Sequence, residues 1–369
     1  MPLRILFTTV ITVLSFTVTI PNVSAQTTPP PDEYMRGTVI NVASGNIQKP
    51  DGSTQIGAKR ITTIRLNSDG EKGTEATIEE TDPDTIAAFP VTTGDSVVVI
   101  KSYSVEGVPT YAMVDTYRIP RLWMLAALFF VAALLFGKLR GASSVLGLIF
   151  TAVVIVGYVV PQIMDGQNPL TVSLVASVII IVPSLYLAHG INARTTIALA
   201  STLVTLAGTA WVATHFVGWA RLSGSGSDDA FFLQGLGLTN INLQGLLLGG
   251  MMLGVLGILD DITTAQSAIV EELKRANAKL STAELYRRGL SVGREHITSL
   301  INTLFLAYAG VSLPLFLLFR ASNDQPLWFI VNSEPIAEEI VRTLVGSLCL
   351  VVAVPITTFL AALWFGKKS

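Results

Sequence analysis

Charged side chains are scarce in this chain: Asp, Glu, Lys and Arg make up 14% of its 369 residues, whereas globular proteins average about a quarter. This deficit, together with 50% hydrophobic residues, excludes a typical soluble protein and indicates one that lies in lipid. The formal net charge of -2 supplies no basic surface, so we expect no nucleic-acid partner.

Cysteine is nearly absent as well. The single one, Cys349, cannot form a disulfide within the chain, and its apolar surroundings predict a small buried hydrophobe. The first 120 residues contain no His, Cys or carboxylate pattern with the spacing of a metal site or a nucleophile. We therefore expect neither a metal nor a cofactor.

The N-terminus has the pattern of a secretory signal peptide. Arg4 precedes an apolar run at residues 5–20, and a small-residue triplet ends at Ala25. We expect residues 1–25 to be a signal peptide, with an uncleaved anchor as the alternative. Residues 26–35, rich in Gln, Thr and Pro, predict a flexible leader. Either way, the residues that follow should be exported.

Residues 36–119 are expected to form a small exported β domain. Five segments alternate apolar and polar residues and are rich in β-branched side chains: RGTVINV, RITTIRL, GTEATIE, DSVVVIK and PTYAMVDTYR. Short strands at this spacing predict a β-barrel or sandwich, and their order suggests an OB-like barrel by analogy. A binding or assembly role is favoured over catalysis, with an envelope protein as partner.

Apolar runs long enough to cross a bilayer, about 20 residues, recur through a multipass membrane domain at 120–369. We place seven transmembrane helices at 122–137, 143–163, 170–188, 195–219, 242–262, 296–319 and 339–365. With residues 26–120 outside, eleven basic residues fall on inner loops and four on outer loops. This bias satisfies the positive-inside rule and predicts a cytoplasmic C-terminus.

The fifth span carries the main candidate site. Asp260 and Asp261 are the only formal charges in a stretch of 41 residues, and acids in a membrane are costly enough to need a partner or a function. A span at 242–262, which we favour, places them at the cytoplasmic mouth. A span nearer 249–270 would place them at mid-membrane and leave 231–248 as a re-entrant or broken element.

Two polar helix faces are expected to meet at this site. Residues at helical spacing continue the face of Asp260 and flank it: Thr264, Ser267, Glu271 and Glu272. In the charged loop after this span, a short helix is expected to start near Ser281, because Ser281 and Glu284 form a capping-box pattern. The helix that follows the loop carries the matching polar face, which contains Arg294, Glu295, His296, Ser299, Asn302 and Thr303.

Three interpretations of these faces stay open. In the first, an aspartate pairs with Arg294 and merely fixes the helix ends. In the second, the acids and His296 bind an ion or relay protons, as intramembrane carboxylates commonly do. The third, an intramembrane hydrolase, is less favoured because adjacent aspartates diverge by about 100°. We favour a transporter or transport accessory that is not an enzyme; a membrane scaffold is the rival.

Other positions indicate packing. Five glycines precede the acidic pair, at spacings that let another helix approach closely, with hinge motion as the alternative: Gly245, Gly249, Gly250, Gly254 and Gly257. Hydroxyls along the fourth span, from Thr202 to Thr209, are expected to bond back to helix carbonyls. Glu338 and Arg342, one turn apart, are expected to form an ion pair.

Two motifs carry a family resemblance. GVLGILDDITTAQSAIVEEL, followed by GLSVGREHITSLINTLFLAYAG, resembles the YibE/F-like family of bacterial multipass membrane proteins, especially actinobacterial members, over about 120–365. The resemblance implies a polytopic fold in the bacterial cell membrane, with the lipid bilayer as a partner and homo-oligomerisation open. It implies no substrate. It marks as motif positions Asp260, Asp261, Glu272, Gly293, Arg294, Glu295, Asn302 and Thr303.

Overall fold

The computed structural model divides into two compact units, with the boundary after Ala126. The predicted signal peptide and the first part of the leader lie outside the residues it describes. Those residues are 31–48, 54–68, 70–104, 107–238, 240–321 and 325–367.

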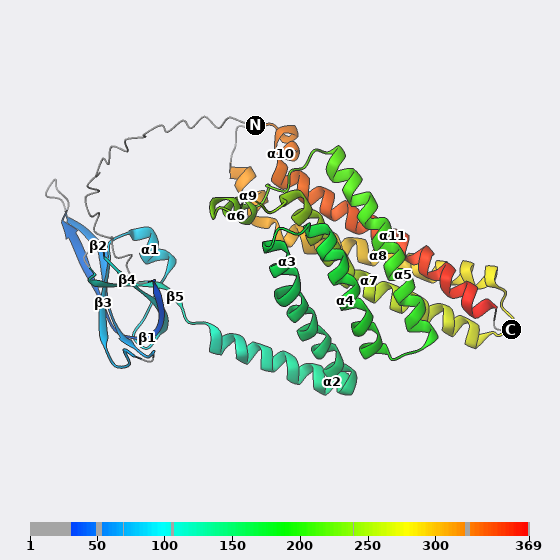
Figure 1. Ribbon diagram of the computed structural model, residues 1–369, viewed down its shortest axis with the longest axis horizontal. Helices are drawn as coiled ribbons and strands as arrows, with labels where there is room; N and C mark the ends of the chain where they lie inside the picture. Colours follow the sequence, from blue (N-terminus) through cyan, green and yellow to red (C-terminus); the bar gives the residue numbers. More distant parts are fainter. Residues whose placement is uncertain are drawn as a thin grey trace, which may run out of the picture. The chain divides into compact units, whose positions relative to one another are not determined.

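The first unit is a curled antiparallel sheet with one short helix (Figure 1). Its elements are β1 (Glu33–Gln48), β2 (Thr54–Leu66), β3 (Glu75–Glu80), α1 (Pro83–Ala88), β4 (Ser96–Tyr103) and β5 (Pro109–Thr116). The strand order is β3-β2-β1-β4-β5, so the first strand is central and pairs with both β2 and β4. The predicted small β domain is confirmed.

Alternation along the strands explains the core of this sheet. Every second residue points inward, which buries one apolar set: Met35, Val39, Ile64, Leu66, Ile78, Val97 and Val99. A charged group is buried beside it. Arg60 pairs with Glu80 at 2.7 Å and donates to the carbonyl of Phe89 at 2.5 Å, so it ties the end of α1 to β2.

The second unit is helical. Among the described residues, six helices are long and apolar enough to cross a membrane: Ile119–Lys138, Gly141–Met164, Pro169–His189, Ala193–Trp219, Leu243–Ala276 and Glu334–Gly366. A further pair, bent by 58°, passes the same test together: Thr282–Val311 with Leu313–Ala321. Counted as one span, this pair gives the predicted seven.

The helices carry these labels in Figure 1: α2 (Ile119–Val154), α3 (Val160–Met164), α4 (Pro169–His189), α5 (Ala193–Trp219), α6 (Asp228–Gly235), α7 (Leu243–Ala276), α8 (Thr282–Val311), α9 (Leu313–Ala321), α10 (Leu327–Asn332) and α11 (Glu334–Gly366). At Lys138 the backbone leaves the helical region, with φ 52° and ψ -135°, and so separates the first two spans. A π-helical turn, Ile155–Val159, joins α2 to α3.

Helix α7 is the centre of the second unit and packs against α4, α5, α8 and α11. Its start is set by Asn242, whose side chain accepts from the backbone N–H of Gly245 at 2.9 Å. The helix continues without a break to Ala276. The predicted capping box at the start of α8 is also present, with Ser281 and Glu284 bonding to each other's backbone N–H groups.

The glycines of α7 divide into two groups. A Cβ at Gly245 would lie 2.9 Å from Cδ of Pro169, and one at Gly249 would lie 2.5 Å from Oγ of Ser173, so α4 packs directly on this face. A Cβ at Gly250 or Gly257 would meet nothing within 4 Å. Gly245 and Gly249 therefore pack closely against α4, whereas Gly250 and Gly257 border open space and a Cβ at Gly254 would lie 3.4 Å from the hydroxyl of Tyr308.

Candidate functional site

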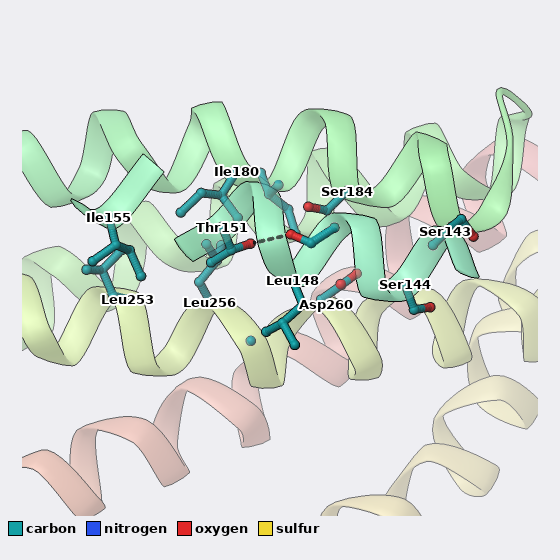
Figure 2. Close-up of a pocket in the computed structure, with 14 residues that line it drawn as sticks. Ser143, Ser144, Leu148, Thr151, Ile155, Ile180, Ser184, Leu253, Leu256 and Asp260 are labelled. Carbon is teal, nitrogen blue, oxygen red and sulfur yellow. Dashed lines mark hydrogen bonds between the residues drawn. The ribbon is translucent and has the colours of Figure 1, made fainter. Parts of the chain in front are cut away.

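A cavity of about 260 Å³ lies beside Asp260, between the second span, α4 and α7. Its polar lining comes from Ser143, Ser144, Thr151, Ser184 and Asp260, and its apolar lining from Gly147, Leu148, Ile155, Ile180, Ile181, Ala188, Leu253, Leu256 and Gly257. Figure 2 shows the three serines and Asp260 toward one end, with Ile155 and Leu253 toward the other.

Helical spacing brings the polar groups of the second span to this cavity. Ser143, Gly147 and Thr151 follow one another at four-residue intervals and so share a face. The hydroxyl of Thr151 donates to the carbonyl of Gly147 at 2.9 Å, which leaves its oxygen able to accept (Figure 2). Ser184 on α4 faces Gly147, whose added Cβ would lie 3.8 Å from the serine Oγ.

Asp260 is half-buried, and its Oδ1 is buried with no hydrogen-bond partner in the described part of the chain. The hydroxyl of Thr264, one turn later, interacts with this carboxylate, but among the described residues no hydrogen bond of normal geometry satisfies either group. Buried polar atoms are normally satisfied, so each such exception needs an explanation. Asp261, by contrast, is exposed and does not line the cavity.

The chemistry of the lining favours a positively charged guest. Carboxylate and hydroxyl oxygens are ligands of hard cations, and a carboxylate also accepts a proton. Among the side chains that the structure describes, no Lys, Arg or His lines the cavity. Among the described residues no three His, Cys, Asp or Glu side chains are grouped as metal ligands. One carboxylate among hydroxyls balances a single positive charge.

Two other predicted polar residues of α7, Ser267 and Glu271, contact the start of α5. Ser267 donates to the carbonyl of Arg194 at 3.0 Å, and Glu271 lies 3.9 Å from the guanidinium of Arg194 and 2.9 Å from that of Arg275. Glu272 pairs with Arg275 at 3.0 Å. These groups fix the helix end beyond the cavity.

The polar faces of α7 and α8 were expected to meet, but in the structure they do not. The α8 residues are exposed and do not line the cavity: Arg294, Glu295, His296, Ser299, Asn302 and Thr303. Among the described residues, no ion pair joins Arg294 to either aspartate. The α7 side chain that hydrogen-bonds to α8 is Gln266, which lies about 120° around the helix from Asp260.

Gln266 is the polar group that sequence reasoning overlooked. It is 2% exposed, and its amide donates to the carbonyl of Gly289 at 2.9 Å and to the hydroxyl of Thr358 at 2.7 Å. It thereby connects α7, α8 and α11. Nearby, the buried hydroxyls of Thr202 and Thr263 bond at 2.9 Å between α5 and α7.

The serines and threonine opposite Asp260 were also missed. Their four-residue spacing in the second span was visible in the sequence, although nothing there indicated which helix they would face. The hydroxyls along α5 largely behave as predicted: Thr202 bonds to the carbonyl of Ala198 and Thr209 to that of Thr205.

Comparison with known proteins gives one family. No curated protein and no solved structure matches the chain significantly. A family model described as YibE/F-like protein matches residues 125–367, which include the helical unit from its second span onward and both sequence motifs. The chain therefore belongs to the YibE/F-like family of proteins.

Proposed function

We propose that the membrane domain is a transporter, or part of one, that binds a proton or a small monovalent cation at Asp260. The observation that supports this most directly is the buried, unpartnered Oδ1 of Asp260 beside a hydroxyl-lined cavity. A bound cation or proton would neutralise the carboxylate, and water in the cavity would supply the missing hydrogen bonds. Asp260 alone is assigned this role, because Asp261, Glu295 and His296 lie outside the cavity.

The proposal includes an orientation, with the β domain outside the cell and the C-terminus in the cytoplasm. The basic residues of the inner loops support it. Asp260 lies 17 residues after the first residue of α7, Leu243, which is about 26 Å along the helix. The hydrocarbon core is about 30 Å thick, so a span that begins at Leu243 puts the cavity near the cytoplasmic side.

The test is cation flux through the purified protein in liposomes. Quenching of a pH-sensitive dye under an imposed proton gradient, and uptake of labelled Na⁺, are measured in parallel. We expect Asp260→Asn to abolish the flux, because the amide keeps the shape but removes the charge. Asp261→Asn is the matched control, one residue away and exposed, and should retain it.

Thermal denaturation in detergent shows whether a loss of flux is a loss of fold. Asp260→Asn should be as stable as the parent or more so, because it removes a partly buried charge. Flux that survives in Asp260→Asn, or that falls equally in both variants, would contradict the assignment. A parent protein that moves neither protons nor Na⁺ would favour the scaffold interpretation.

A further inference from the structure

A second cavity, of about 280 Å³, lies nearer the start of α7. It is bounded by α6, α7, α8, α11 and the loop that follows α5. Its charged and hydroxyl groups are Ser227, Asp229, Tyr308, Glu338 and Arg342, and the rest of its wall is Gly224, Ala230, Leu233, Leu246, Leu247, Gly250 and Gly254. This volume has room for several water molecules, at about 30 Å³ each.

Two opposite charges, those of Glu338 and Arg342, face this cavity without pairing with each other. Glu338 and Arg342 were expected to form an ion pair across one helical turn, but this prediction is wrong. Arg342 pairs instead with Glu339 at 2.8 Å, and its Nε is buried without a partner in the described residues. Glu338 is 4% exposed and accepts from the backbone N–H of Gly226 at 3.0 Å.

The loop over the cavity is held in place by α11. The carboxylate of Glu334 accepts from the backbone N–H and the hydroxyl of Ser223, both at 2.6 Å. Gly224 has φ +85° and sits so close to α7 that an added Cβ would lie 2.2 Å from the carbonyl oxygen of Leu243. Because these contacts fix the loop, the cavity exists before any ligand enters, as binding sites usually do.

We propose that this cavity binds a small zwitterion with an apolar side chain, of the size of an α-amino acid. Its ammonium group binds the carboxylate of Glu338, with Asp229 at the rim adding negative potential. Its carboxylate binds the guanidinium of Arg342 and the hydroxyl of Tyr308. The leucines of α7 and the open face of Gly250 receive the side chain.

A zwitterion fits the lining better than an ion of either sign. Glu339 binds only the Nη1 group of Arg342, so a simple cation would leave the buried Nε–H of Arg342 without an acceptor. A simple anion would lie against the buried carboxylate of Glu338, and like charges in a desolvated site are strongly unfavourable. A molecule that carries both charges supplies a cation to Glu338 and an acceptor to the Nε–H of Arg342. The site shares no lining residue with the cavity at Asp260, so the two proposals stand or fall separately.

The test is direct binding of labelled L-leucine to the purified full-length protein in detergent. Isopentylamine and 4-methylpentanoate, which carry the same branched chain with only one of the two charges, are the competitors. We expect L-leucine to bind and each competitor to bind at least about thirtyfold more weakly, because each loses a charged contact. Equal competition by isopentylamine, or no binding of L-leucine, would overturn the proposal.

Two variants place the binding in this cavity. Glu338→Gln keeps an oxygen to accept from the N–H of Gly226 but loses the charge, and should bind L-leucine about thirtyfold more weakly. Gly250→Val adds a side chain where a Cβ meets nothing within 4 Å, so it fills the cavity without displacing protein atoms. Gly208→Val, on α5 and equally unobstructed, is the control. L-leucine binding that Gly250→Val leaves unchanged would refute the site even if Glu338→Gln failed to fold.

Discussion

Replacing Gly293 with Ala should weaken the junction of α7, α8 and α11. The added Cβ would lie 2.5 Å from Cγ1 of Val354 and 2.8 Å from Oε1 of Gln266, far inside normal contact. Val354 is 1% exposed and cannot step aside into lipid. Such overpacking costs about 1–3 kcal/mol, whereas the gain in helix propensity from Gly to Ala is about 1 kcal/mol, so the net change should be destabilising by up to about 2 kcal/mol.

A control variant separates the cost of the close contact from the gain in helix propensity. Gly208→Ala also lies within a spanning helix, but its Cβ meets nothing within 4 Å, so it should gain about 1 kcal/mol. The two variants should therefore differ by about 1–3 kcal/mol, or several degrees in Tm at about 2–4 °C per kcal/mol. Thermal denaturation of both proteins in one detergent measures this. If Gly293→Ala proved as stable as Gly208→Ala, α8 could not approach α7 and α11 this closely.

Two further predictions concern the β domain and the orientation. Hydrogen bonds from Lys101 and Tyr111 hold the pKa of Glu71 below its usual range, so the stability they add is present above about pH 4.3 and is lost as the pH falls through the lowered pKa. The denaturation midpoint of residues 31–117, expressed alone, should fall in acid, and Glu71→Gln should make that fall shallower; equal slopes would contradict the role of Glu71. After Cys349→Ala, Lys72→Cys should react with an impermeant thiol reagent on intact cells and Ser281→Cys only after permeabilisation; the reverse would overturn the orientation.

The sequence predicted the local elements because each depends on neighbours along the chain. Alternation predicted the strands that carry Val97 and Val99, and the capping box predicted a helix start at Ser281, although the helix was expected to be short and in the structure continues to Val311. Apolar length gave the number of spans. Asp260 itself was visible because charge is rare around it, and its side chain does line a cavity.

What lies around Asp260 could not be predicted, because helical spacing defines a face but not the helix that covers it. The α8 polar face was expected there, and serines of the second span and α4 occupy the place instead. The predicted ion pair of Glu338 was wrong for a related reason. The i,i+4 rule named Arg342 as its partner, but the backbone N–H of Gly226, 112 residues away in sequence, bonds to it.

Because some glycines of α7 contact α4 and others border open space, substitutions in this one helix can test folding and ligand binding separately. At Gly249 a larger residue would strike α4, so substitution should lower the yield of folded protein while any surviving molecules keep their ligand affinity. At Gly250 a larger residue occupies only the void, so folded protein should persist while affinity falls. A substitution scan of this helix would measure the yield of folded protein and the ligand affinity of each variant. Gly249 variants should lose yield and Gly250 variants should lose affinity, so the scan would identify the residues that line the cavities without a ligand-bound structure.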